Sequence, residues 1–465
     1  MSDSNPFEKA SASSEVPGSL EEQGGATDNR PNLFADKSFW GRICTQFLGA
    51  FNDNLYKQLM LLLAIPAAAA GAAAAGAQNG GDVQGWATLV FSLPFVLLSG
   101  YAGYLSDRFS KTPIIVLCKV TEIIVMLLGL AAFYFFDLFG TAGTWIVLFL
   151  MGTQSSFFGP GKYGILPELF RKDDLPRANG VMVMTTFLAI IFGTVFAGGL
   201  KKVLVGEDGS ADSLWLGLLI CVGIAIVGTL SSLLVRRVAP ANPSIKLTKD
   251  CFALHNEIAQ LLKADKPLLG ALLVSSVFWL VSGIAVPTVN RLGLSMLEAD
   301  DLMTSALTAS IGLGIMIGAL LASLLCRKRY SQLCVKIGLF GVFGTLVALG
   351  AWRAGQVHLL GFWGSVCGLV LMGVFAAIFA IPIQVFLQSR PPVALKGRMI
   401  ATMNQANFIG ILISGPLYQV FESFASWLNW PVSAVFWMMA VLMLPVAIVY
   451  NLDEDSEPQP PQSKR

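Results

Sequence analysis

The stretch at residues 40–66 is apolar overall but carries polar side chains at helical spacing. Gln46, Asp53 and Lys57 fall on one face of a helix, with Asn54 beside that face and Asn52 next to Asp53. An ionisable side chain inside an apolar helix is costly in lipid, so it usually faces the bundle interior or a water-filled cavity. Opposite charges four residues apart can pair with each other or bind charges on a ligand. We interpret these five residues as candidate ligand-binding residues; a permanent ion pair that only fixes helix packing is the alternative.

A second pair of opposite charges lies within the apolar run 114–136. Lys119 and Glu122 are three residues apart and share one helical face. They could form a second polar pocket, in which Glu122 could also bind a proton. Alternatively, Lys119 could extend to the membrane surface and place its ammonium among the headgroups. The sequence leaves both interpretations open, and both residues join the candidate binding set.

Glycine and proline break the apolar pattern between residues 159 and 168. Lys162, Tyr163 and Glu168 lie in or next to this break, and Arg177 and Asn179 follow it. Proline removes a helical hydrogen bond, so such a segment can bend. These five residues could line an exit for a ligand, or they could form a gating hinge, which is the commoner use of such a segment.

Uncharged amides occur in the second half of the chain. Asn404, Asn407 and Ser414 mark one face of the run 397–421, and Gln384 and Gln388 lie in the preceding run. Amides inside membranes more often join helices than bind ligands. We therefore treat them as secondary.

The sequence contains no recognisable catalytic motif. Its only histidines, His255 and His358, lie in separate connections, and no GxSxG elbow or HExxH helix occurs. Residues 71–76 resemble the start of a phosphate-binding loop but lack the following Lys and Ser or Thr. We therefore expect neither an enzyme nor an ATP-driven pump, and no cofactor, metal ion or nucleic acid.

The composition predicts the elements that must position these residues. Of the 465 residues, 55% are hydrophobic and only 13% are charged, about half the charge of a soluble domain. About 20 apolar residues form a helix that crosses the hydrocarbon core. Apolar runs predict an all-α membrane protein with about twelve transmembrane helices in two six-helix halves. The expected spans are 40–66, 84–105, 114–136, 142–161, 176–200 and 213–235, then 267–290, 302–326, 332–352, 357–387, 397–421 and 431–450.

The distribution of basic residues predicts the orientation of these spans. Alternate connections carry Arg108 and Lys111; Arg171, Lys172 and Arg177; residues 236–266; residues 327–329; and Arg390, Lys396 and Arg398. Connections such as 67–83 and 137–143 have no Lys or Arg. Because basic residues favour the cytosolic side, both termini are expected in the cytosol.

The expected organisation follows from the same pattern. It comprises a disordered cytosolic tail at 1–38, a six-helix bundle at 39–235, a cytosolic linker at 236–266, a second six-helix bundle at 267–451 and a disordered cytosolic tail at 452–465. Within the linker, residues 247–262 show a helical apolar stripe, which predicts an amphipathic helix on the membrane surface.

A loop motif lies between the second and third expected spans, where residues 103–111 read GYLSDRFSK. It resembles the G-x-L-x-D-R-x-G-[RK]-[RK] loop of the major facilitator superfamily, with Ser110 at the usual glycine position. The resemblance implies a latch at the cytosolic gate. Gly103 would let two helices approach closely, Asp107 would meet a helix N-terminus or an arginine, and Arg108 and Lys111 would supply the positive charges.

Three further segments resemble the lysophospholipid transporter family within that superfamily. They are QFLGAFNDN at 46–54, GPGKYGILPEL at 159–169 and LPRANG at 175–180. The resemblance implies a major facilitator fold. It also implies transport of lysophospholipids from the outer to the inner leaflet of a bacterial inner membrane, where a cytosolic acyltransferase restores the second chain. Asp53 would then meet the ammonium of a zwitterionic headgroup and Lys57 its phosphate, and the 162–179 residues would steady the departing phosphate.

Two rival functions remain at this stage. One is a proton-coupled exporter of small amphipathic compounds, with Asp53 or Glu122 as the proton carrier. The other is a sensor that binds lipid without moving it, although the connections predicted outside the membrane are short. In each case membrane lipids surround the chain, which we expect to act as a monomer.

Overall fold

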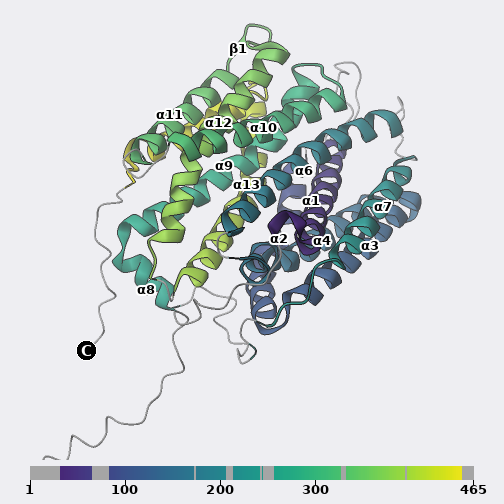
Figure 1. Ribbon diagram of the computed structural model, residues 1–465. Helices are drawn as coiled ribbons and strands as arrows, with labels where there is room; N and C mark the ends of the chain where they lie inside the picture. Colours follow the sequence, from purple (N-terminus) through teal and green to yellow (C-terminus); the bar gives the residue numbers. More distant parts are fainter. Residues whose placement is uncertain are drawn as a thin grey trace, which may run out of the picture.

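The computed structural model describes residues 32–64, 83–171, 174–205, 213–240, 243, 256–325, 331–392 and 395–452. In these ranges twelve helices of at least 16 residues follow one another (Figure 1). The first six are α1 (Lys37–Leu63), α2 (Gln84–Arg108), α3 (Lys111–Tyr134), α4 (Phe136–Gly164), α6 (Leu175–Leu204) and α7 (Leu214–Ser232). The second six are α9 (Lys266–Ser295), α10 (Asp301–Leu325), α11 (Ser331–Leu349), α12 (Gly361–Ser389), α13 (Lys396–Trp427) and α14 (Ala434–Val449). Shorter elements are η2 (Leu33–Ala35), α5 (Leu166–Leu169), α8 (Asn256–Ala264), β1 (Trp352–Arg353) and β2 (Val357–His358).

The long helices have the length and apolar composition that a membrane requires. In the described ranges ten of them qualify as candidate spans, and α14 is a shorter apolar helix. Helix α1 is less apolar because Arg42, Asp53 and Lys57 lie within its 27 residues. The prediction of an all-α, multi-pass membrane protein is therefore confirmed, with ten of the twelve expected spans supported by composition alone.

Each half of the chain has a hydrophobic core of its own. The N-terminal core includes Leu55 of α1, Met126 of α3 and Leu218 of α7. The larger C-terminal core includes buried residues of all six long helices in that half, from α9 to α14. In Figure 1 the purple-to-blue helices and the green-to-yellow helices form two groups that meet where α2 contacts α13 and α6 contacts α10. The two predicted halves are thus two separately packed bundles.

The contacts between the halves include two close helix crossings. A Cβ atom on Gly85 of α2 would lie 2.3 Å from the carbonyl oxygen of Gly415 on α13. A Cβ atom on Gly198 of α6 would lie 2.3 Å from Ser305 Oγ on α10. Small residues permit this approach of backbones in membrane proteins. We call this end of the molecule, where α1, α6 and α9 end and α2 and α10 begin, the closed end. Helix α8 lies at the opposite end (Figure 1).

Three local predictions differ from the structure. Helix α12 begins at Gly361 rather than at 357, because residues 352–358 form a hairpin that pairs Trp352 with His358. Helix α4 begins six residues early, at Phe136, and bends at Gly140, whose φ is 55°.

The amphipathic helix predicted at 247–262 overlaps α8 (Asn256–Ala264), and residues 247–255 lie outside the described part. Its apolar side chains Ile258, Leu261 and Leu262 join the C-terminal core. The prediction that this apolar face lies on the membrane is therefore wrong for residues 256–262, because protein covers it.

Candidate substrate-binding site

Asp53 lies near the middle of α1, where this helix faces α4. Ser155 of α4 donates a hydrogen bond of 2.6 Å from Oγ to Asp53 Oδ2. The second carboxylate oxygen, Oδ1, is buried and has no hydrogen-bond partner among the described residues. A carboxylate can accept several hydrogen bonds, and leaving a buried one unsatisfied costs free energy. Asp53 therefore has capacity for a cation or for a donor of a ligand.

Lys57 lies one helical turn beyond Asp53 and is half-buried. Its ammonium lies over the ring of Phe91 on α2, with 5.2 Å between Nζ and the ring centroid. In the described part of the chain, no ion pair joins Lys57 to Asp53, so the predicted pair is not formed in this conformation. The reason is that neighbouring helices supply other partners, Ser155 for the carboxylate and Phe91 for the ammonium. Both charges are thus available to opposite charges on a ligand.

Lys119 and Glu122 form an ion pair inside the N-terminal bundle. Both are buried, with 0% and 2% of their side chains exposed, so the alternative in which Lys119 reaches the membrane surface is wrong. Asn52 of α1 donates hydrogen bonds to Glu122 Oε1 (3.1 Å) and to the carbonyl of Cys221 on α7 (3.0 Å). A Cβ atom on Gly228 of α7 would lie 3.0 Å from Lys119 Nζ, so glycine provides the space for the ammonium.

This buried network joins α1 to α3 through a hydrogen bond to a charged carboxylate and α1 to α7 through a neutral one. Removing one member would leave an uncompensated charge in low dielectric. We therefore interpret the network as structural: it holds α1 in place against α3 and α7. The predicted second pocket at Lys119 and Glu122 is occupied by protein groups in this conformation.

The two remaining α1 candidates make structural contacts. Gln46 donates to Thr186 Oγ1 on α6 at 3.3 Å, and Asn54 donates to the carbonyl of Ala50 in its own helix at 2.7 Å. Gln46 joins two helices, whereas Asn54 is half-buried beside Asp53. Of the seven predicted binding residues, Asp53 and Lys57 therefore have the geometry most open to a ligand.

The predicted gating loop lies at the end of the molecule opposite the closed end. A Cβ atom on Gly103 would meet no atom within 4 Å, and Asp107 is exposed. Arg108 donates to the hydroxyl of Tyr104 in its own helix. The expected close approach at Gly103 is therefore absent from this conformation, because the described contacts between the halves concentrate at the other end.

Two gating candidates meet each other. Lys111 at the start of α3 forms an ion pair with Glu168 of α5. The carbonyl of Lys162 accepts a hydrogen bond of 3.1 Å from Arg42 Nη2. The side chains of Tyr163, Arg177 and Asn179 lie outside the described residues.

Arg42 is a residue that the sequence interpretation missed. It is fully buried in α1, and its guanidinium lies 5.0 Å from the ring centroid of Phe158 on α4. Ser155 was also missed, since a serine within an apolar run carries no signal of its contact with Asp53.

A buried cluster of amides joins the halves at the closed end. Asn290 of α9 accepts hydrogen bonds from Gln58 of α1 and from Thr308 of α10, both at 2.8 Å. It donates to Gln84 Oε1 of α2 at 2.9 Å. Gln84 also donates to the carbonyl of Pro287 at 3.2 Å. This cluster could not be predicted from spacing along the chain, because its members lie in four different helices.

Two ion pairs add to this closure at the surface. Lys201 and Lys202 of α6 pair with Asp301 and Asp300, each at 2.8 Å. Burial acts to raise the pKa of Asp300, but hydrogen bonds from Lys202 and from the Met303 amide outweigh it, so the pKa lies below its usual value. The closed end thus combines a buried polar core with a charged rim.

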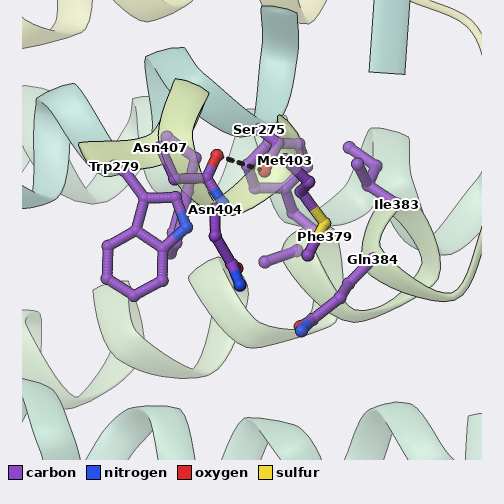
Figure 2. Close-up of a pocket in the computed structure, with 10 residues that line it drawn as sticks. Ser275, Trp279, Phe379, Ile383, Gln384, Met403, Asn404 and Asn407 are labelled. Carbon is purple, nitrogen blue, oxygen red and sulfur yellow. Dashed lines mark hydrogen bonds between the residues drawn. The ribbon is translucent and has the colours of Figure 1, made fainter. Parts of the chain in front are cut away.

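A pocket opens in the C-terminal half between α9, α12 and α13 (Figure 2). Its cavity volume is about 100 Å³, and its walls include the rings of Phe278, Trp279 and Phe379. Asn407 accepts a hydrogen bond of 2.9 Å from Ser275, the helix-joining role expected of it.

Comparison with known proteins identifies the fold. A model of the Major Facilitator Superfamily matches residues 43–415. This chain belongs to the Major Facilitator Superfamily. Solved structures agree on the fold of this superfamily member: an auto-inhibited POT family peptide transporter superposes with a TM-score of 0.69 at 14% identity, covering 91% of this chain and 99% of that one. A bacterial homologue of the iron transporter ferroportin in its inward-facing state gives a TM-score of 0.61 at 14% identity, covering 90% and 100%.

Curated relatives of this superfamily member confirm the predicted resemblance. Lysophospholipid transporter LplT of Photorhabdus laumondii is 29% identical over 403 residues, covering 81% of this chain and 87% of that protein. LplT of Serratia proteamaculans is 25% identical over 387 residues, with coverage of 81% and 87%. The chain is therefore a membrane transporter by family and is similar to lysophospholipid transporters.

Proposed function

We propose that this protein moves lysophospholipids from the outer to the inner leaflet of a bacterial inner membrane, so that they can be re-acylated. The observation that carries the proposal is the placement of Asp53 and Lys57 on one face of α1 without an ion pair between them. The relatives named lysophospholipid transporters support the choice of substrate.

The chemistry of the headgroup matches these two side chains. A zwitterionic headgroup carries an ammonium, which would meet Asp53, and a phosphate, which would meet Lys57. The buried Oδ1 of Asp53 has no partner among the described residues, so a bound ammonium would stabilise it. Binding then exchanges counter-ions and leaves neither charge bare in low dielectric. The single acyl chain would lie along apolar helix faces.

Alternating access supplies the movement between leaflets. The described contacts between the halves concentrate at the closed end, in the glycine crossings, the amide cluster and the two ion pairs. With both termini in the cytosol, the closed end faces the periplasm and the structure corresponds to an inward-facing state. Rocking of the two bundles about the central site would open the closed end and engage the loop at Gly103 and Asp107.

The proposal includes a role within lipid repair. The transporter acts as a monomer and performs no catalysis of its own. A cytosolic acyltransferase consumes the delivered lysolipid, which keeps its inner-leaflet concentration low. This partner supplies the direction of net flow and requires no stable complex.

Uptake of labelled lysophosphatidylethanolamine into proteoliposomes tests the proposal. We expect Asp53→Asn and Lys57→Ala each to lower uptake by about tenfold or more, because a charge-assisted hydrogen bond contributes about 1.5–3 kcal/mol. Lys263→Ala, which removes an exposed lysine of α8, is the matched control.

The outcomes separate the proposal from its rivals. Normal uptake by both α1 variants would contradict the proposed binding of the headgroup by Asp53 and Lys57. Absence of lysolipid uptake by folded wild type, together with drug efflux that an uncoupler abolishes, would establish the exporter instead. Lipid binding without transfer between leaflets would establish the sensor.

A further inference from the structure

The pocket of the C-terminal half differs in chemistry from the site on α1. None of its ten lining residues is charged. Its polar side chains are Ser275, Gln384, Asn404 and Asn407, and aromatic rings form much of the remaining wall. A charged group placed there would lack a counter-ion, which is costly in low dielectric. The pocket therefore suits an uncharged polar group attached to an apolar chain.

The hydrogen bonds of the pocket leave both donors and acceptors free. Ser275 donates to Asn407 Oδ1, which leaves the Nδ2 group of Asn407 as a donor. Asn404 and Gln384 form no hydrogen bond with other described residues, and both side chains are exposed. In Figure 2 their amides project away from the wall that Asn407 and Ser275 share. A hydroxyl, which both donates and accepts, matches this set, and an ester carbonyl matches the donors.

A chain of aromatic rings connects this pocket with the charged site. Lys57 lies over Phe91, whose ring centroid is 5.6 Å from that of Phe95. Phe95 of α2 stacks on Phe408 of α13 at 4.2 Å. Phe408 lies four residues beyond Asn404, one turn along the same helix face. The charged site and the amide pocket therefore flank one aromatic contact between the halves.

We propose that this pocket binds the glycerol segment of the lysophospholipid, and that Asn404 and Gln384 recognise its free hydroxyl. This inference rests on the proposed function and extends it to substrate selection. A lysophospholipid carries a hydroxyl where a diacyl phospholipid carries a second ester and chain. Esterification removes the donor and leaves the amide oxygens of the pocket without a hydrogen bond from the lipid. A site built to hydrogen-bond a hydroxyl rejects an analogue that lacks it.

The test compares two lipids in proteoliposomes that contain the full chain. One is 1-acyl lysophosphatidylethanolamine, and the other is its 2-O-methyl ether with the same acyl chain and headgroup. We expect wild type to take up the hydroxyl lipid about tenfold faster, because the bound lipid covers the two amides and a lost hydrogen bond then leaves one polar group unpaired. Asn404→Ala and Gln384→Ala should bring this ratio close to one while retaining the methyl ether rate.

Gln388→Ala is the matched control, because Gln388 lies one turn beyond Gln384 on α12 and is not among the lining residues. It should keep the wild-type ratio. Size-exclusion profiles in detergent report whether each variant is folded. A wild-type ratio in both folded pocket variants, or a wild-type ratio of one, would overturn the inference and leave the proposed function intact. If wild type takes up neither lipid, the result contradicts the proposed lysophospholipid transport and also this inference, which rests on it.

Discussion

Replacing Asn290 tests the idea that the amide cluster holds the closed end together. Asn290→Leu removes three hydrogen bonds, to Gln58, Gln84 and Thr308, all between 2.8 and 2.9 Å. Interhelical hydrogen bonds in membranes contribute about 0.6 kcal/mol each on average, so the loss amounts to about 2 kcal/mol. Two of these bonds cross between the halves and exist only when the end is closed. Losing these two bonds, about 1.2 kcal/mol together, should therefore shift the population toward the open arrangement by about eightfold.

Spin labels on the two halves measure this shift. Leu216 of α7 and Val347 of α11 are exposed and lie near the closed end, one in each half. Their separation should lengthen when the closed end opens, in a background without native cysteines. Gln58→Leu removes one bond and should give about a threefold shift, which provides a graded series. Asn451→Ala, at an exposed asparagine, is the control.

A distance distribution of Asn290→Leu that matches that of wild type would contradict the role of the amide cluster. An equally large shift in Gln58→Leu and Asn290→Leu would also contradict it, since the effect would then not follow the number of bonds. Loss of folding is recognised separately by the elution profile in detergent.

Three further predictions concern other contacts. Lys119→Met should lower the free energy of unfolding by about 3–5 kcal/mol, because Glu122 is left buried and unpaired, and adding Glu122→Gln should restore much of the loss in detergent melting curves. Unchanged melting of the single variant would contradict the role of the pair. Gly85→Ala should separate the halves, since its Cβ would lie 2.3 Å from the oxygen of Gly415; a wild-type spin-label distance would refute this. Asp300→Asn should weaken the closed end by less than about 1 kcal/mol. Because the pKa of Asp300 lies below its usual value, its ion pair persists at neutral and mildly acidic pH and is lost only in stronger acid. The variant should therefore differ from wild type equally at both of these pH values, and a difference confined to one of them would refute the assignment.

Hydropathy predicted most of the fold because lipid imposes a strong rule on sequence. A backbone in hydrocarbon must satisfy its own hydrogen bonds, so long apolar runs become helices with few exceptions. The span that corresponds to α1 was predicted even though Asp53 and Lys57 lie within it, because its polar residues share one face. The hairpin at 352–358 was missed because its turn has positive φ at Gly355 and Gln356, and a short segment leaves no periodic signal.

The candidate site was less predictable, since its contacts join different helices. Spacing within one helix placed Lys119 and Glu122 on one face, and in the structure they pair with each other. Asp53 and Lys57 also share a face but are not paired, because Ser155 of α4 binds the carboxylate. Local spacing shows which side chains share a face, whereas their partners depend on which helix packs against that face.

The separate cores of the two bundles determine where the energy of the transport cycle lies. In the proposed movement each bundle turns as a rigid unit, so its interior packing would be the same before and after the movement. The difference in free energy between the two orientations is then confined to a thin seam of glycines, amides and ion pairs. Substitutions along this seam can tune the turnover rate while the folding of each bundle remains unchanged.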